Sequence, residues 1–191
     1  MTVATWTIDA YTLHWSLTTA DGSTIDTLEL KPILHGDHAR IIEAYTDDDD
    51  RLIQLLSASC GVAASTLEEL RRPDYNSLAM RIAELVTQDA AHFMEEARAA
   101  HQNPDAPELL LPITVNGEKI TSVTLSVPTL KASRLMTKCK TAYERAEFIT
   151  AHCTGLMLPD LALLSVPDWN TLQERINDFL NEPADSFQTA I

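Results

Sequence analysis

Hydrophobic residues recur along this chain in two kinds of pattern, and each kind occurs in both halves. The first is an alternation of apolar and polar positions that leads into a turn at Asp21-Gly22 and again at Asn116-Gly117. These dipeptides tolerate the positive φ angles of tight hairpin turns, so the pattern predicts two β-hairpins. Their return strands are expected at 24–30 and 119–127. The alternating apolar positions of the first strands are Leu13, Trp15 and Leu17, then Leu109, Leu111, Ile113 and Val115.

The second pattern places apolar residues at i, i+3, i+4 and i+7, which is typical of one face of an α-helix. It begins after each hairpin, at His38 and at Ala132. A second helix is predicted at 49–60 and at 143–153, and each is followed by a glycine suited to a left-handed helix C-terminus. These glycines are Gly61 and Gly155.

A short helix is predicted next in each half, around Leu67 and around Leu161. Ser65 and Glu68 have the spacing of a capping box at the start of the first, and Pro159 marks the start of the second.

The last helix of each half lies in the most similar pair of segments. Residues 73–86 (PDYNSLAMRIAELV) and 167–180 (PDWNTLQERINDFL) are identical at six of fourteen positions. Asp74 and Asp168 are predicted to be the N-caps of these helices. The apolar stripe of the first helix is expected to continue through Phe93, Met94 and Ala97.

Because the whole order of elements recurs after about 94 residues, we interpret the chain as a tandem duplication. The predicted fold class is α+β, mainly α, with two copies of a β-hairpin followed by three to four helices. The first unit is expected at 1–100, a linker at 101–108, the second unit at 109–180 and a flexible tail at 181–191. Each unit is small for an independent core, so we expect the units to pack together or the chain to oligomerise.

Composition and charge narrow the classes of function. The net charge of −14 disfavours nucleic acid as a direct ligand, because phosphate binding requires clustered lysine and arginine. The sequence has no 18-residue apolar run and no N-terminal pattern of a secretory signal, so neither a membrane span nor export is expected. Three cysteines, none in a CxxC pair, favour buried thiols in a reducing cytoplasm.

The charge differs between the halves. Unit one carries four consecutive acids at 47–50, whereas unit two carries Lys131, Arg134 and Lys138 with the spacing of one helix face. Both sets can be ordinary solvated surfaces. Alternatively, the two units differ in sign because they face each other or a charged partner, which makes the three basic residues candidate partner-binding residues.

The sequence contains no catalytic motif, and we expect neither an enzyme, a cofactor nor a small-molecule substrate. His35, Asp37 and His38 lie close together, but three ligands at one short helix start rarely converge on a metal. His152 and Cys153 are adjacent on a helix and therefore point in different directions, so a nucleophile with its base is not expected.

The four acids at 47–50 lack the spacing of a calcium loop and suit a helix N-terminus. The aromatic pair Tyr75 and Trp169 is expected to anchor the core rather than a partner.

Three segments of unit two carry a family resemblance: LSVPTL at 125–130, HCTGLMLPDLALL at 152–164 and VPDWNTLQERINDFL at 166–180. They resemble the tail assembly chaperones of long-tailed phages, in particular the small tail assembly proteins of Mu-like and related contractile-tail phages. The resemblance spans about 109–180 and is weaker in unit one. It implies a non-enzymatic protein of the bacterial host cytoplasm that binds the long tape measure protein during assembly and is absent from the finished particle. Two units in one polypeptide depart from the usual pattern of the family.

Two other hypotheses remain open at this point. The chain could be a structural tail or baseplate adaptor that stays in the particle. It could also be an acidic inhibitor that mimics DNA, although its acids cluster at 47–50 instead of being spread over one surface. For the chaperone, the hypothesis places a partner helix in a groove between helices, beside the basic face of unit two.

Overall fold

The computed structural model describes residues 8–187 as two small antiparallel hairpins embedded in a mainly helical structure, which confirms the predicted fold class. The elements of the first half are β1 (Tyr11–Thr18), β2 (Thr24–Leu28), α1 (His35–Ala44), α2 (Asp48–Cys60), α3 (Ala64–Leu67), α4 (Arg72–Thr87), the 3-10 turn η1 (Ala91–Phe93) and α5 (Glu96–Ala99). Those of the second half are β3 (Glu108–Val115), β4 (Glu118–Ser122), α6 (Leu130–Met136), α7 (Ala142–Thr154), α8 (Leu158–Leu161), α9 (Val166–Asn181) and the 3-10 turn η2 (Ala184–Phe187).

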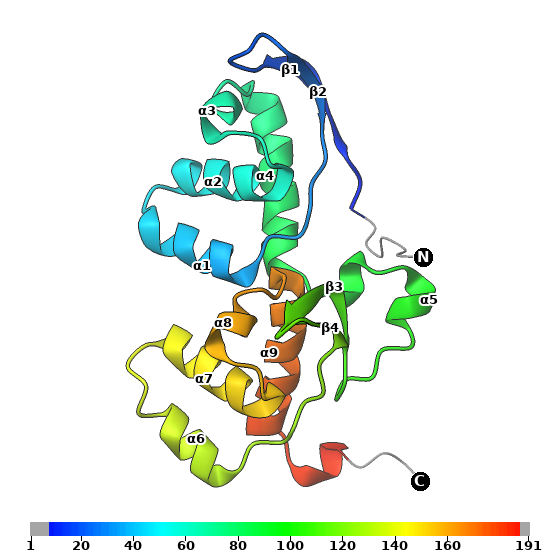
Figure 1. The fold of residues 1–191 in the computed structure, drawn as a ribbon, viewed down its shortest axis with the longest axis vertical. Coiled ribbons are helices and arrows are strands. Elements are labelled where there is room, and N and C mark those ends of the chain that lie inside the picture. The colour runs from blue at the N-terminus through cyan, green and yellow to red at the C-terminus, as the bar shows by residue number, and fades with distance from the viewer. Residues whose placement is uncertain (1–7, 188–191) are drawn as a thin grey trace.

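The order of a hairpin followed by four helices is the same in both halves. The bounds of α2, α3 and α4 differ from those of α7, α8 and α9 by 94 residues throughout. The halves are stacked along the long axis of the molecule, with α4 above α9 in the view of Figure 1. The last helix of each half is therefore the spine on which the other elements pack.

Both hairpins are irregular in the same part of the ladder. The pairing register shifts between Thr12 and Leu17 in the first hairpin and between Glu108 and Ile113 in the second. Leu13 and Leu17 are buried, but Trp15, predicted on the same face, is 49% exposed. The prediction for Trp15 was wrong because the pairing register shifts in this stretch, and the strict alternation of side chains between the faces of the strand is lost. The return strands are also shorter than predicted and end at 28 and 122.

Most helix termini follow the local sequence signals. Gly61 and Gly155 end α2 and α7 with φ of 72°, as predicted for left-handed C-terminal residues. The carboxylate of Asp47 accepts hydrogen bonds from the amides of Asp49 and Asp50, so the acidic run caps a helix N-terminus. The predicted capping box at Ser65 was wrong, because the N-cap of α3 is Ala63, two residues earlier, and Ser65 lies inside the helix.

The predicted N-caps of the last helices were also wrong. α4 begins at Arg72 and α9 at Val166, two residues before Asp74 and Asp168. In the second half the cap is Ser165, whose hydroxyl accepts a hydrogen bond from the amide of Asp168. The two aspartates are therefore inside the first turn, and their carboxylates are available to other partners.

Each of these carboxylates binds the first strand of its own hairpin. In each half, two consecutive backbone amides of that strand donate to the aspartate. The donors are His14 and Trp15 to Asp74, both at 3.1 Å, and Leu110 and Leu111 to Asp168, at 2.6 and 3.2 Å. These hydrogen bonds attach the hairpin to the last helix and use amides that the irregular ladder leaves available.

α4 ends at Thr87 and does not continue through Phe93 and Met94 as predicted. The side-chain amide of Asn170 donates to the carbonyls of Val86 and Gln88, at 3.1 and 2.9 Å, and so binds carbonyls at the end of the helix. Phe93 and Met94 remain buried, but they reach the core from the turns that follow. The end of α4 is therefore bound by Asn170 of the other half, a contact that the local sequence pattern cannot reveal.

The buried side chains form two clusters, one in each half. Leu110 and Val166 belong to the second half of the chain but pack in the core of the first. The halves therefore pack on each other, which is one of the two arrangements expected from the sequence.

The segment between the halves and the C-terminal segment are both attached to α9. Arg175 forms an ion pair with Asp105 at 2.7 Å, inside the predicted linker. Its guanidinium also lies over the rings of Phe179 and Phe187, at 4.8 and 4.9 Å from their centroids. The part of the predicted tail that the structure describes therefore contacts α9, and residues 188–191 lie outside the described residues. Within 8–187, no helix is long and apolar enough to cross a membrane.

Candidate partner-binding site

The halves meet where the start of α1 approaches the loop between α8 and α9. The amide of His35 donates to the carbonyl of Leu164 at 2.7 Å, and the amide of Gly36 donates to that of Ala162 at 3.0 Å. In the opposite direction, the amide of Val166 donates to the carbonyl of Ile33 at 2.8 Å. The N-terminus of α1 thus satisfies two of its free amides with carbonyls of the other half.

Gly36 is required at this contact by space rather than by backbone conformation. A Cβ on Gly36 would lie 2.8 Å from the Cβ of Ala162 and 3.1 Å from its carbonyl oxygen. A larger residue would therefore move α1 away from the second half.

Aromatic contacts continue the junction on one side. The ring of His35 stacks on Trp169, with centroids 3.8 Å apart, and is also stacked against Tyr143 at 5.7 Å. Burial, and to a smaller extent the charge of His38, lower the pKa of His35 to about 4. The imidazole is therefore neutral near pH 7 and acts as a flat ring within the junction.

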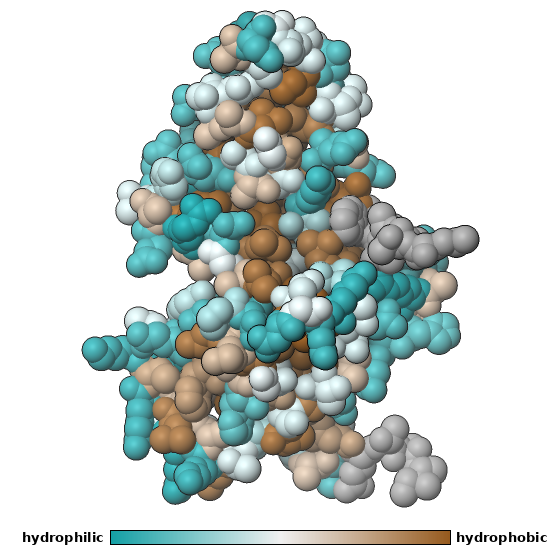
Figure 2. All heavy atoms as spheres, in the orientation of Figure 1, coloured by the Kyte–Doolittle hydropathy of each residue, from teal (hydrophilic) through white to brown (hydrophobic). Residues whose placement is uncertain are grey.

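Beside this stack, α1, the start of α7 and the start of α9 enclose an open cleft of about 600 Å³, which we call the inter-half cleft. Figure 2 shows an indented surface between the two halves on the side of α1 and α7. Its lining is largely apolar and comes from both halves. The residues that line it are His35, His38, Ala39, Ile42, Glu43, Val86, Thr141, Tyr143, Glu144, Val166, Trp169 and Asn170.

Two apolar side chains of the inter-half cleft are accessible to a partner. Ile42 on α1 is 40% exposed and Tyr143 on α7 is 44% exposed, whereas Trp169 is almost fully buried beneath them. Burial, a hydrogen bond with Glu147 and the charges of Glu147 and Glu43 raise the pKa of Tyr143 to about 12. The phenol is therefore a neutral hydrogen-bonding group at the mouth of an acidic cleft.

The predicted basic residues lie elsewhere in the second half. Lys131 and Arg134 are exposed on α6, while Lys138 is exposed in the turn after that helix ends at Met136. The three residues therefore do not share one helix face as predicted, and none lines the inter-half cleft. Large apolar residues are exposed next to them, namely Val127, Leu130 and Leu135. Figure 2 shows hydrophobic residues at the surface around α6 and α7.

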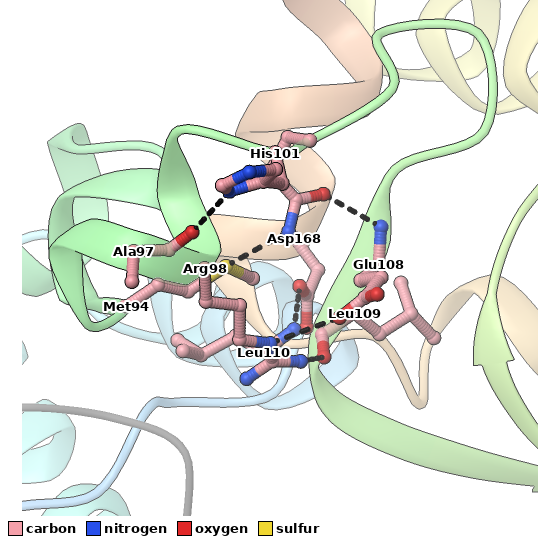
Figure 3. A network of polar contacts seen from close by, with 9 residues as sticks. Met94, Ala97, Arg98, His101, Glu108, Leu109, Leu110 and Asp168 are labelled. Atoms are coloured by element: carbon pink, nitrogen blue, oxygen red, sulfur yellow. Dashed lines mark hydrogen bonds and ion pairs between the residues drawn. The ribbon is translucent and has the colours of Figure 1, made fainter.

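A second group of polar contacts holds the segment that joins the halves (Figure 3). Arg98 on α5 donates to the carboxylate of Glu108 at 2.9 Å and to the carbonyl of Leu109 at 3.0 Å. The next residue of β3, Leu110, donates to the buried carboxylate of Asp168. Figure 3 shows these side chains converging on the start of β3, so they fix the hairpin and form a structural network.

The remaining candidate residues have structural positions. Tyr75 and Trp169 are buried, which confirms the prediction that they anchor the core. Cys153 is buried next to the core of the second half, and burial raises the pKa of its thiol to about 11. Among residues 8–187, no group of three or more His, Cys, Asp or Glu side chains is placed to hold a metal ion, and this includes the group around His35 and His38.

Sequence reasoning did not find the inter-half cleft. Its walls come from residues about 100 positions apart in the chain. No sequence motif links His35 and Ile42 on one wall with Tyr143 and Asn170 on the other. The only signal was the weak one that His38 lies within an apolar stripe.

In the second half, a hairpin is attached to a group of helices through the carboxylate of Asp168. Residues 107–181 match the family described as phage tail assembly chaperone proteins, E, or 41 or 14. This stretch begins just before β3 and ends with α9, so the match covers all of the second half from β3 to α9. The resemblance predicted from the sequence is confirmed for these residues. No curated protein and no solved structure matches the chain.

Proposed function

We propose that this protein is a non-enzymatic tail assembly chaperone that binds the tape measure protein and keeps it soluble while the tail is built. The observation that carries the proposal is the family match over residues 107–181. The proposed place of action is the cytoplasm of the bacterial host, and the proposed partner is a protein rather than a nucleic acid, a membrane or a small molecule.

The surface of the protein supports this role. A long amphipathic helical protein exposes apolar stripes until the tail tube encloses it, and a chaperone must cover those stripes without becoming insoluble. Exposed apolar residues around α6 and in the inter-half cleft offer contact surface, and the net charge of −14 keeps a complex soluble. We assign Lys131, Arg134 and Lys138 to the rim of the α6 surface, where they would pair with acidic residues of the partner.

We further propose that the two halves are copies of one unit, with boundaries at 1–100 and 109–180. The offset of 94 residues between the bounds of α2, α3 and α4 and those of α7, α8 and α9 supports a duplication. So do the equivalent contacts of Asp74 and Asp168 with the first strand of each hairpin. Two units would allow one chain to contact two successive stretches of a partner.

Co-expression with the tape measure protein tests the proposed function. We expect the tape measure protein to be insoluble alone and soluble in a complex that purifies with this chain. A tape measure protein that is soluble and folded alone and forms no complex would contradict the proposal. Mass spectrometry of purified particles separates the chaperone from an adaptor, because a retained adaptor would be present in the particle.

A further inference from the structure

We propose that the inter-half cleft binds one face of an amphipathic helix that carries lysine or arginine along its edges, and that this helix is a segment of the tape measure protein. The inference rests on the proposed function and adds to it a site and the chemical character of the bound segment. The residues that carry it are Ile42, Glu43, Val86, Tyr143, Glu144 and Trp169.

The lining requires apolar side chains from the occupant. Ile42 and Tyr143 stand on opposite walls, from α1 and α7, and both are partly exposed although they lie in a concave site. Val86 and Trp169 continue the apolar surface toward the junction of the halves. Side chains inserted between the walls would remove this surface from water, which is the main source of favourable free energy in such grooves.

The form of the site favours a helix over an extended peptide. All of its lining residues lie on helices or next to them, and none belongs to β1, β2, β3 or β4. An added strand would find no open sheet edge in the cleft. A helix satisfies its own backbone and needs only pockets for side chains at i, i+3 or i+4, and i+7. A volume of about 600 Å³ accommodates a few such side chains.

The charge of the rim defines the edges of the helix. Glu43 and Glu144 line the cleft, and Glu147 interacts with Tyr143 at its mouth. Among residues 8–187, none of these carboxylates takes part in an ion pair. No lysine or arginine lines the cleft, and burial lowers the pKa of both His35 and His38. The rim is therefore negative near pH 7 and complementary to lysine or arginine.

The site exists only because two units share one chain. His35, Ile42 and Glu43 come from the first half, whereas Tyr143 and Trp169 come from the stretch that matches the chaperone family. A single unit would have at most one wall of the cleft. The inter-half cleft thus gives the two-unit chain a binding surface that neither unit has alone.

The test uses the full chain and a set of overlapping synthetic peptides that cover the tape measure protein, each long enough for several helical turns. Binding is measured by fluorescence anisotropy. We expect at least one peptide with basic edges to bind the wild-type chain. We expect Ile42→Glu to lower the affinity for that peptide about tenfold or more. The matched control is Met80→Glu, because Met80 is a highly exposed apolar residue on α4 outside the cleft.

Charge is tested separately. Glu43→Lys should weaken the binding of the same peptide and reduce the dependence of its affinity on salt. The control Glu118→Lys, on β4, makes the same change in net charge and should alter the affinity and its salt dependence only by that general effect. Circular dichroism of each variant establishes that it is folded. A variant that fails to fold is replaced by Tyr143→Ser, which truncates an exposed ring on the opposite wall.

The outcomes separate the site from the proposed function. If peptides bind but Ile42→Glu and Met80→Glu weaken them equally, the inter-half cleft is not the site, and the chaperone function stands. If no peptide binds the wild-type chain, the inference is overturned even where the full-length tape measure protein co-purifies. If only peptides with acidic edges bind this chain, the assigned occupant is wrong. It is also wrong if sedimentation shows that the wild-type chain is a dimer which Ile42→Glu separates.

Discussion

Replacement of the buried Asp168 by alanine should destabilise the protein clearly, because this carboxylate connects the second hairpin to its helix. Asp168 is 1% exposed and its carboxylate accepts three hydrogen bonds. These come from the amides of Leu110 and Leu111, at 2.6 and 3.2 Å, and from the hydroxyl of Ser165 at 2.6 Å. They attach β3 to the first turn of α9, so Asp168→Ala removes the polar connection between the second hairpin and its helix.

The magnitude follows from the groups that lose an acceptor. A buried donor without its acceptor costs about 1–3 kcal/mol, and two strand amides are affected, while the Ser165 hydroxyl can rotate toward another acceptor. Removal of a carboxylate from a buried site returns part of this cost, because burial disfavours the charge. We therefore expect a loss of about 2–4 kcal/mol, which lowers the melting temperature by roughly 10 °C for a chain of this size.

Urea unfolding, followed by circular dichroism, measures the loss. The matched control is Glu174→Ala, at an exposed position of the same helix, which should change the free energy of unfolding by less than about 0.5 kcal/mol. If Asp168→Ala destabilises no more than this control, the hydrogen bonds to β3 do not hold the hairpin and the reasoning is refuted.

The pH dependence gives the same experiment a second readout. Burial raises the pKa of Asp168 above its ordinary value of 3.8, despite the hydrogen bonds it accepts. Its contribution to stability is therefore complete below about 3.8 and is lost as the pH rises through the folded-state pKa. Asp74 differs: burial raises its pKa, but hydrogen bonds from His14, Tyr11 and Trp15 outweigh burial, and the net pKa is lowered. Its contribution is present above about 3.8 and is lost as the pH falls, so Asp168→Asn and Asp74→Asn should change the pH profile in opposite directions.

Three further predictions concern the junction and the C-terminal turn. Gly36→Ala should cost about 1–3 kcal/mol, because the new Cβ would lie 2.8 Å from that of Ala162, and calorimetry should show a lower melting temperature than in wild type. Burial lowers the pKa of His35 to about 4, so the wild type should lose stability as the pH falls from 6.5 to 4, by at most about 1.4 kcal/mol per pH unit from this residue. His35→Leu should reduce this loss. Arg175→Ala should weaken the contact between α9 and η2, leaving the packing of Phe179 on Phe187, and so accelerate limited proteolysis near Phe187 without a change in helix content.

Local signals were sufficient to predict the order of elements. The glycines at 61 and 155 adopt the positive φ that a helix C-terminus requires, and the turns at 22 and 117 do the same for the hairpins. These positions depend on backbone conformation within a few residues of sequence, which is why the sequence reveals them. The bounds of the second helices were therefore correct to within one residue.

The errors arose where a distant group competes with a local one. An aspartate in the first turn of a helix is a good N-cap locally, but Asp74 and Asp168 bind strands about 60 residues away. Trp15 alternates with leucines in sequence, yet it is exposed where the ladder is irregular and its amide donates to Asp74. The local pattern gives no information on either partner, so these positions could be placed only once the chain was folded.

The inter-half cleft could not be predicted for a further reason, which is that the two halves are not equivalent at the junction. The residues of α6 that correspond to His35 and Gly36 are Leu130 and Lys131, each at the same position from the helix start. Lys131 has a Cβ where Gly36 has room for none, and Leu130 lacks the flat ring that stacks on Trp169. On the other side, the ring of Tyr75, which corresponds to Trp169, already has the guanidinium of Arg72 over it at 4.5 Å.

This asymmetry decides which surfaces remain open. The start of α1 is used to join the halves and, beside that contact, creates the inter-half cleft. The start of α6 has no such role. Val127, shortly before α6, and Leu130, its first residue, are 63% and 69% exposed and lie next to the basic Lys131 and Arg134. The chain therefore presents an acidic cleft at its centre and a basic, apolar edge at one end. If the partner contacts both surfaces, charge reversal at Glu43 should weaken the binding of basic segments, and charge reversal at Arg134 should weaken the binding of acidic segments. Peptides that respond identically to both variants would exclude two distinct contacts.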